Sequence, residues 1–265
     1  MSTVPVLPLT GERTVPDLPA ENYWFRRHEA AYRAVEPLLP VGRVLEIGVG
    51  EGYGADLLGA AGYGADLLGA AGARRLTGLD YDAGTLAHVR RRYPAVAVAR
   101  GNAVALPVRT GAVAAVVSMQ LIEHLWDQPA HLSECARVLA PGGTLVLSTP
   151  NRLTFSPGYD PATDRPRNIY HSRELSPTEL AGLVAAVLPG ATMYGLHAGA
   201  RLAEVDARCR RRYGTDLVEA QLAVPAAEWP AGLAELVGSV TAADFVLSTS
   251  DLDGALDLIV VAAKS

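Results

Sequence analysis

The chain has 265 residues and a formal net charge of −5, and this acidic balance argues against nucleic acid or an anionic membrane as a partner. Its 49% hydrophobic and 19% charged residues are ordinary for a soluble globular enzyme that buries a substantial core. Cys135 and Cys209 are isolated, so we expect neither a disulfide framework nor a cysteine metal site, and a reducing, cytoplasmic setting fits best. No run of about 18 apolar residues occurs, so we expect no membrane partner.

The first half of the chain alternates between predicted strands and helices. Residues 1–20 carry repeated prolines, which favour an extended arm over the surface, and residues 21–39 predict an amphipathic helix. Because the strands that follow are near-continuous apolar runs separated by helices, we expect a parallel sheet covered on both faces. These strands are predicted at residues 43–48, 74–80, 95–100, 113–118 and 144–149, with helices at 83–93 and 129–139.

The second half begins with a long loop and returns to the sheet at its end. Residues 150–172 are rich in proline and arginine, and a loop of this length in a compact domain is usually functional. Ser176, followed by proline and by glutamate three positions later, predicts a helix start. Residues 200–238 predict a helical insertion, flanked by strands at 192–197, 244–248 and 256–262. No linker divides the chain, so we expect residues 1–265 to form one domain.

A glycine-rich turn joins the first predicted strand to the next helix, with the sequence Glu46-Ile-Gly48-Val-Gly50-Glu-Gly52. Glycines let a ligand approach the main chain, and the following helix offers free N–H groups and a positive dipole end. The glycines can be explained in three ways: they form a simple tight turn, they bind a dinucleotide, or they bind S-adenosylmethionine (SAM). SAM is favoured because Glu46 would repel a pyrophosphate but suit an ammonium or sulfonium. Asp80, at the end of the second strand, can accept both hydroxyls of a ribose.

Five segments resemble the motifs of class I SAM-dependent methyltransferases: "VLEIGVGEGYG", "TGLDYD", "GNAVALP", "VVSMQLIEHLWD" and "LAPGGTLVLSTPN". The resemblance as a whole extends over most of the chain. This resemblance implies an α/β Rossmann-like fold. Its sheet would have seven strands, mostly parallel with an antiparallel last strand, and helices on both faces. It also implies SAM as the cofactor and S-adenosylhomocysteine (SAH) as the product.

The family pattern assigns cofactor contacts to this chain residue by residue. The helix at 21–39 would cover the cofactor, and Arg27 or His28 would meet the methionine carboxylate, although these side chains could instead serve the core or the surface. Tyr81 would lie beside the adenine, and Asn102 would stand where the family more often has aspartate. The full set of expected cofactor residues is Tyr23, Trp24, Arg27, His28, Glu46, Gly48, Gly50, Glu51, Gly52, Asp80, Tyr81, Asn102, Ala103 and Gln120.

Two histidines are candidates for removing a proton from the acceptor. His124 follows the fourth strand, where ligands bind in such folds, and we expect it to act as a general base that Glu123 orients. His171 is a second candidate, for catalysis or for binding a sugar, and either histidine could instead be structural. The expected acceptor-binding residues are Asn151, Arg152, His171 and Arg173. No cluster has dedicated metal-ligand spacing, so no metal site is assigned, while Mg²⁺ stays open because some sugar methyltransferases use it.

A narrower resemblance concerns the acceptor. The segments "GERTVPDLPAENYWFRRH", "IEHLWDQ", "STPNRLTFSPG", "HSREL" and "ALDLIVVA" resemble actinobacterial sugar O-methyltransferases of methylmannose and methylglucose polysaccharide biosynthesis. This resemblance implies a small-molecule or oligosaccharide acceptor and favours the reducing-end 1-OH of a short methylated mannoside. A glucoside, an antibiotic sugar, a phenol or a polyketide stays open, as do a SAM-binding protein without catalysis, a nucleotide-dependent oxidoreductase and a homodimer.

Ten residues occur twice in succession: "GYGADLLGAA" at 52–61 recurs at 62–71. The first copy contains the last glycine of the turn, so we expect it to be the functional one. The second copy is expected to be a structural insertion, with a break in the helix between Gly59 and Gly64 because each glycine inside a helix costs about 1 kcal/mol.

Overall fold

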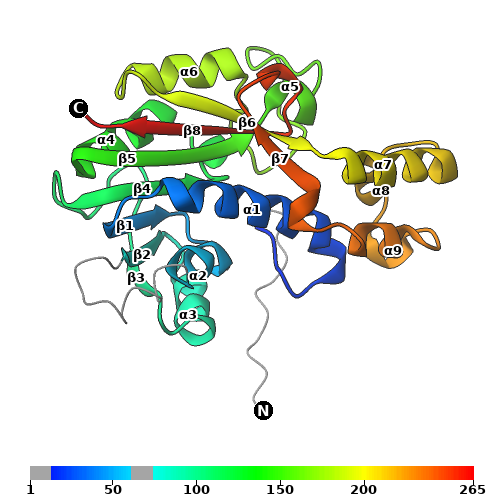
Figure 1. Cartoon of the computed structure of the whole chain (residues 1–265), viewed down its shortest axis with the longest axis horizontal. Helices are drawn as coiled ribbons and strands as arrows, with labels where there is room; N and C mark the ends of the chain where they lie inside the picture. The colour runs from blue at the N-terminus through cyan, green and yellow to red at the C-terminus, as the bar shows by residue number, and fades with distance from the viewer. Residues whose placement is uncertain (1–12, 61–73) are drawn as a thin grey trace.

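The fold is built on one twisted sheet, which Figure 1 shows in the computed structural model; the structure describes residues 13–60 and 74–265. Within these residues the sheet has eight strands in the order β3-β2-β1-β4-β5-β8-β6-β7. The neighbouring pairs from β3 to β5 are parallel, whereas β8 is antiparallel to both β5 and β6, and β7 is antiparallel to β6. The strands are β1 (Gly42–Ile47), β2 (Arg74–Asp80), β3 (Ala97–Arg100), β4 (Val113–Met119), β5 (Leu139–Pro150), β6 (Thr192–Ala198), β7 (Phe245–Ser248) and β8 (Asp257–Ala263).

The predicted Rossmann-like, mostly parallel sheet is confirmed, with one strand more than the seven that the resemblance implied. The additional strand is β7, which the sequence predicted at 244–248 and which pairs with the free edge of β6. It can pair there because Phe245 is buried against the core while Val246 faces solvent, the alternation of an edge strand with one covered face.

Helices cover both faces of the sheet, and the strands alternate between two cores. Val44 and Val146 belong to one core, whereas their neighbours Leu45 and Leu145 belong to the other, as the two-residue period of a strand requires. The first core is closed by α1, α2 and the helices of the insertion; the second is closed by α4 and α6. The helices are α1 (Asn22–Val35), α2 (Tyr53–Ala60), α3 (Ala83–Arg92), α4 (Gln128–Val138), α5 (Arg152–Phe155), α6 (Pro177–Ala185), α7 (Ala200–Tyr213), α8 (Leu217–Leu222) and α9 (Leu233–Gly238).

Local sequence signals set where several helices begin. Ser176 and Glu179 form the predicted capping box at the start of α6, each side chain accepting from the other's backbone N–H. Asp82 caps α3 by accepting from Thr85 N at 2.8 Å, and Asp127 caps α4. Short 3₁₀ turns lie between the helices and strands, at Pro19–Glu21, Glu36–Leu38, Ile122–His124, Ala226–Glu228, Ala242–Asp244 and Leu252–Gly254.

Parallel pairing brings the carboxyl ends of β1, β2 and β4 to one edge of the sheet. The residues that follow these strands, Gly48, Tyr81 and Gln120, therefore meet at the place where open α/β sheets bind ligands. The helices α7 to α9 project beyond one end of the sheet (Figure 1). No helix in the described residues is long and apolar enough to cross a membrane.

The first copy of the repeat forms the turn before α2 and α2 itself. The second copy, at residues 62–71, and the expected break before Gly64 lie outside the described residues.

Candidate active site

A first pocket of about 360 Å³ lies over the carboxyl ends of β1, β2 and β4, and the glycine turn forms one wall of it. Gly48, Gly50 and Gly52 have φ values of 76°, 52° and 102°, a backbone region that other residues rarely adopt. A Cβ atom on Gly48 would also stand 2.9 Å from Leu121 Cδ1. The turn therefore requires glycine both for its conformation and for its fit. Gly52 lies at the back of the turn against Tyr93, not among the residues that line the pocket.

Asp80 lines the first pocket next to the glycine turn. Its Oδ2 accepts a hydrogen bond from Gly50 N at 3.1 Å, and its Oδ1 accepts from Asp82 N at 3.0 Å, so the carboxylate is held at the pocket wall. Tyr81 is 74% exposed and lies at the rim. Asn102 and Ala103 complete this side of the pocket. The structure thus brings together the residues that the sequence placed around a nucleoside.

Glu46 occupies a different position from the one expected. It is fully buried and does not line the first pocket; instead Tyr32, which does line it, donates a hydrogen bond to Glu46 Oε1 at 2.6 Å. Burial raises the pKa of Glu46 to about 8, although the bond from Tyr32 opposes the rise. Glu46 Oε2 has no hydrogen-bond partner among the described residues. A cation in the first pocket would favour the ionised carboxylate, so this wall fits a ligand that carries a sulfonium or ammonium.

Glu51 also differs from expectation. It belongs to the pocket lining, but its buried carboxylate is turned to Tyr93 and His88, each at 2.8 Å, and to Arg92 at 3.1 Å. These contacts join the glycine turn to α3. The carboxylate is therefore structural, because its oxygens are already engaged away from the pocket.

The helix α1 lines the first pocket through His28, Ala31 and Tyr32, so of the residues expected from its sequence only His28 is among them. Arg27 is buried and forms a bidentate pair with Asp257 of β8, with both N–O distances at 2.6 Å, so its guanidinium is not available for a methionine carboxylate. Tyr23 packs edge-on against Trp24 and Phe245 in the core, away from the first pocket. His28 does line the first pocket, but burial lowers its pKa to about 4, so its imidazole is neutral at physiological pH.

Arg13 is a basic residue of the first pocket that sequence reasoning missed. It lines this pocket together with Thr14, and its guanidinium donates to Thr85 Oγ1 at 2.8 Å. The only sequence signal was its place in "GERTVPDLP", within the segment predicted as an extended arm.

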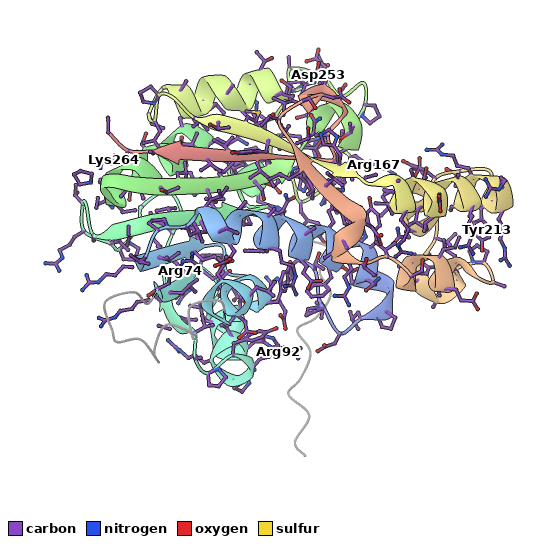
Figure 2. All side chains as sticks on the ribbon, viewed as in Figure 1. Arg74, Arg92, Arg167, Tyr213, Asp253 and Lys264 are labelled. Atoms are coloured by element: carbon purple, nitrogen blue, oxygen red, sulfur yellow. The ribbon has the colours of Figure 1, made fainter. Side chains whose placement is uncertain are left out.

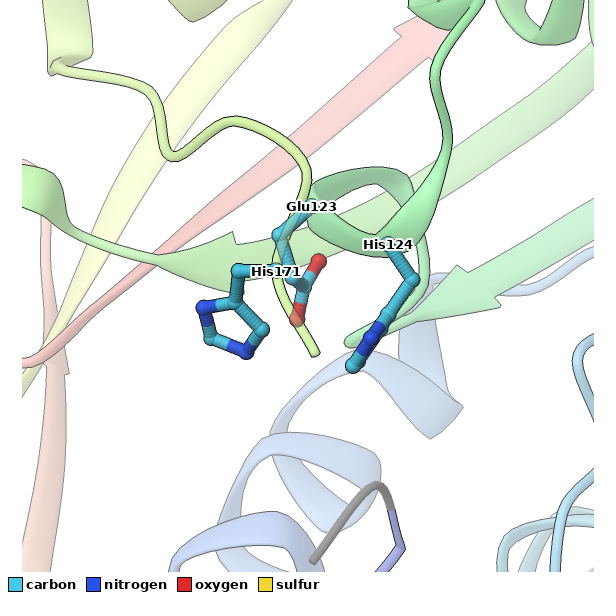
Figure 3. A group of neighbouring side chains, drawn as sticks. All are labelled: Glu123, His124 and His171. Atoms are coloured by element: carbon cyan, nitrogen blue, oxygen red, sulfur yellow. The ribbon is translucent and has the colours of Figure 1, made fainter. Parts of the chain in front are cut away.

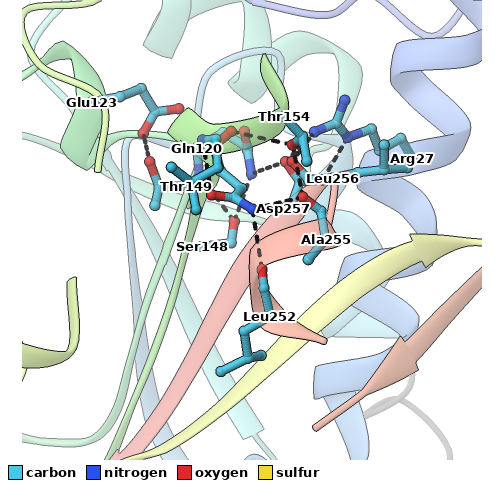
Figure 4. A network of polar contacts seen from close by, with 12 residues as sticks. Arg27, Gln120, Glu123, Ser148, Thr149, Thr154, Leu252, Ala255, Leu256 and Asp257 are labelled. Carbon is cyan, nitrogen blue, oxygen red and sulfur yellow. Dashed lines mark hydrogen bonds and ion pairs between the residues drawn. The ribbon is translucent and has the colours of Figure 1, made fainter. Parts of the chain in front are cut away.

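Gln120 lies at the junction between the first pocket and a second pocket that adjoins it. Its φ of 51° is unusual for a residue other than glycine and costs on the order of 1–3 kcal/mol. The side chain is held by bonds to Ser148 Oγ at 3.1 Å and Asp257 Oδ1 at 3.3 Å, as Figure 4 shows. Asp257 therefore fixes two residues at once, Arg27 on one side and Gln120 on the other.

A second pocket of about 520 Å³ adjoins the first. The two share a wall formed by Arg13, Thr14, His28, Gln120 and His124. Ligands in the two pockets would therefore lie next to each other. The remaining residues around the second pocket come mainly from α1, the loop at 150–172, the 3₁₀ turn Ile122–His124 and α8. Among them are Trp24, Glu123, Phe155, Asn168, Tyr170, His171 and Leu222.

Glu123, His124 and His171 form a cluster in the second pocket, and Figure 3 shows the Glu123 carboxylate close to both imidazole rings. Their potential ligating atoms lie within 4.8 Å of one another, a spacing that could also hold a divalent cation. The imidazole rings meet edge-on with centroids 4.9 Å apart. The sequence could not reveal this cluster as a whole, because His171 comes from a distant loop.

The carboxylate of Glu123 was expected to orient His124, but its hydrogen bond is with Thr149 Oγ1 at 3.1 Å. Burial raises the pKa of Glu123 to about 7, and the nearby His171 opposes this rise. His124 Nδ1 lies 3.1 Å from the carbonyl oxygen of Tyr170, and His171 Nδ1 lies 2.7 Å from Glu174 Oε1.

The structure places three of the expected acceptor-binding residues away from both pockets. Asn151 is fully buried, and its amide donates to the carbonyl oxygens of Leu252, Asp253 and Ala255, so it joins the loop before β8 to α5. Arg152 and Arg173 both pair with Glu179 of α6. Of the expected set, His171 alone lines the second pocket.

Comparisons with known proteins identify the family of this chain. The family model described as "Methyltransferase domain" matches residues 45–147. A protein of Mycobacterium tuberculosis named as a probable S-adenosylmethionine-dependent methyltransferase is 46% identical over 98% of this chain and 90% of its own length. A similarly named protein of Mycolicibacterium smegmatis is 47% identical over 97% and 95%. A crystal structure of a SAM-dependent methyltransferase from Thermotoga maritima has a TM-score of 0.62 at 18% identity, covering 92% of this chain and 94% of its own, and so shows the fold. This chain belongs to the SAM-dependent methyltransferases.

Proposed function

We propose that this methyltransferase transfers the methyl group of SAM to a sugar hydroxyl, with the reducing-end 1-OH of a short methylated mannoside as the first acceptor to test. The observation that carries this proposal is the second pocket, which offers two imidazoles, the amide of Asn168 and the hydroxyl of Tyr170 beside the first pocket. Such groups suit the many hydroxyls of a sugar, because each can donate or accept a hydrogen bond.

The first pocket is where SAM would bind, and its bound sulfonium would supply a methyl group that is already activated. Asp80 would accept from the ribose hydroxyls, Tyr81 would flank the adenine, and Asn102 would reach the adenine amine. The buried Glu46 would stabilise the positive charge through its proximity to the pocket wall, and Arg13 would be the basic group for the methionine carboxylate.

A sugar hydroxyl is a poor nucleophile at neutral pH, so the acceptor needs a group that takes its proton. His124 and His171 lie together in the second pocket, and His124 also lines the first. We therefore assign proton removal to one of these imidazoles. The remaining polar groups of the pocket would align the acceptor oxygen with the methyl group, since methyl transfer is an in-line displacement.

The insertion at 200–238 would help to enclose the acceptor. Leu222 of α8 lines the second pocket, and Arg167, labelled in Figure 2, pairs with Glu219 of the same helix at 2.8 Å. This pair ties the loop at 150–172 to the insertion. The insertion therefore belongs to the same functional domain as the sheet in this proposal.

An aromatic small molecule is the second candidate acceptor. Trp24, Phe155, Ile169 and Leu222 give the second pocket an apolar side that could hold a phenol or a polyketide. A glucoside or an antibiotic sugar would use the polar side instead.

Two experiments test the function. Calorimetry should show binding of SAM and SAH but not of NAD, and transfer of a labelled methyl group should be strongest to short methylated mannosides in a panel with glucosides and phenols. Transfer to phenols alone would contradict the sugar acceptor and favour the aromatic small molecule instead. Failure to bind SAM would contradict the assignment of the first pocket.

A further inference from the structure

Glu174 is a buried carboxylate that lies behind the second pocket without lining it. Its side chain has no exposed surface, and its Oε1 lies 2.7 Å from His171 Nδ1. Its Oε2 has no hydrogen-bond partner among the described residues. Removing a carboxylate from water costs several kcal/mol, and the Glu174 carboxylate makes a single hydrogen bond that could offset this cost. Its burial is therefore hard to explain by stability.

The contacts of His171 define which ring nitrogen carries the proton. A carboxylate accepts, so Nδ1 donates to Glu174 and carries the hydrogen of the neutral ring. A second contact gives the same answer: Asn168 Oδ1 accepts from Tyr170 N at 3.0 Å, which turns Asn168 Nδ2 toward His171 Nε2 at 3.1 Å. An amide NH₂ can only donate, so Nε2 accepts. Its lone pair lies on the side of Asn168, which also lines the second pocket.

We propose that Glu174 is a positioning residue that holds His171 in the tautomer needed to take the proton of the acceptor hydroxyl. This inference rests on the proposed function and assigns the base within it. An oriented carboxylate behind an imidazole fixes the tautomer and stabilises the imidazolium that forms, the arrangement known from Ser-His-Asp enzymes.

The proton transfer balances as follows. The acceptor hydroxyl replaces the Asn168 amide at His171 Nε2 and gives its proton to that nitrogen. Its oxygen forms a bond to the methyl group while the bond between that methyl and the cofactor sulfur breaks, and the electron pair stays on sulfur. The imidazolium of His171, paired with Glu174, then returns the proton to water.

The test compares Glu174→Gln, which removes the charge at constant shape, with Glu174→Asp, which keeps it. Glu29→Gln is the matched control, because Glu29 is also buried and ion-paired but lines neither pocket. We expect Glu174→Gln to lower kcat by about 10²-fold or more, with the acceptor KM and the SAM Kd within about twofold of wild type. Glu174→Asp should recover most of this loss, and the control should keep full activity. The melting temperature of Glu174→Gln should not fall, because the variant removes a buried charge.

A separate readout does not need the acceptor. Long-range ¹⁵N–¹H spectra of the wild-type enzyme should show His171 protonated at Nδ1, and Glu174→Gln should show a mixture of tautomers. Protonation at Nε2 in the wild type would overturn the proposal, as would a Glu174→Gln enzyme whose kcat stays within threefold. If no sugar is methylated, the proposed function fails while the wild-type spectrum still decides the role of Glu174.

Discussion

At the scale of single residues, the two imidazoles of the second pocket should contribute unequally. If His171 takes the proton, His171→Ala should lower kcat by roughly 10²–10⁴, the range for loss of a general base. His124→Ala should cost about tenfold, because this ring packs against His171 and helps to orient it. Steady-state kinetics of SAH formation measures both. A larger loss for His124→Ala than for His171→Ala would reverse the two roles.

Glu46 should make the stability of the protein depend on pH. Its pKa in the folded protein is about 8, above the ordinary value of 4.5. The folded state therefore keeps the proton of Glu46 up to a higher pH than the unfolded state does. The stabilising contribution is complete below about pH 4.5 and is lost as the pH rises through about 8. Glu46→Gln should therefore raise the melting temperature relative to wild type more at pH 8.5 than at pH 5.5. An equal difference at both values would mean that Glu46 is ionised throughout.

The same substitution should affect the ligand. Because the Glu46 carboxylate favours a positive charge in the first pocket, Glu46→Gln should lower the affinity for SAM by about tenfold. A factor of ten is the same free energy as a shift of one pKa unit. It should weaken SAH less, since SAH lacks the sulfonium charge. Calorimetry with both ligands at pH 8 provides the measurement, and equal losses for the two ligands would place the sulfonium away from Glu46.

At the scale of elements, the glycine turn and the irregular start of β5 offer a matched pair of substitutions. Gly50 and Gly142 both have positive φ values, 52° and 74°, and neither has a neighbour that a Cβ atom would crowd. Alanine should cost each site a similar backbone penalty of about 1 kcal/mol. Only Gly50→Ala should also weaken SAM binding, because Gly50 lines the first pocket. Equal SAM affinities in the two variants would show that the ligand does not approach this backbone.

The loop at 150–172 and the insertion should act together on the acceptor. Arg167→Ala removes the ion pair with Glu219 and should raise the acceptor KM several-fold while leaving SAM affinity unchanged, since Arg167 lines the second pocket but not the first. Arg210→Ala is the control, because its pairs with Asp206 and Asp216 stay within the insertion. Equal effects of the two substitutions on the acceptor KM would show that the ion pair between the loop and the insertion does not matter for acceptor binding.

The sequence predicted the elements better than the contacts between them. Apolar runs and caps are local signals, so the strands, the capping box at Ser176 and the position of Asp80 were all readable. The partners of Arg27, Asn151 and Arg152 come from distant segments, and a single sequence carries no signal for such pairing. Three basic or polar side chains expected at ligands are used instead to join elements. Arg13 was missed for the same reason, because only the fold brings the arm to the pocket.

At the scale of the whole molecule, the second copy of the repeat should be dispensable. Residues 62–71 repeat a segment whose first copy already supplies Gly52 and α2. Their deletion should leave SAM affinity unchanged and the melting temperature equal or higher, which calorimetry and thermal unfolding can measure. A large loss of SAM binding would show that the second copy contributes to the first pocket.

The position of β8 has a consequence for how the protein is made on the ribosome. In sequence this strand follows β6 and β7, yet it lies between β5 and β6 in the sheet. During synthesis β5 and β6 therefore each present an unpaired edge until β8 emerges. Exposed edges of this kind invite pairing with other chains. Asp257, at the start of β8, also reaches Arg27 and Gln120 only at that stage, so the contacts that hold these two side chains form late in synthesis.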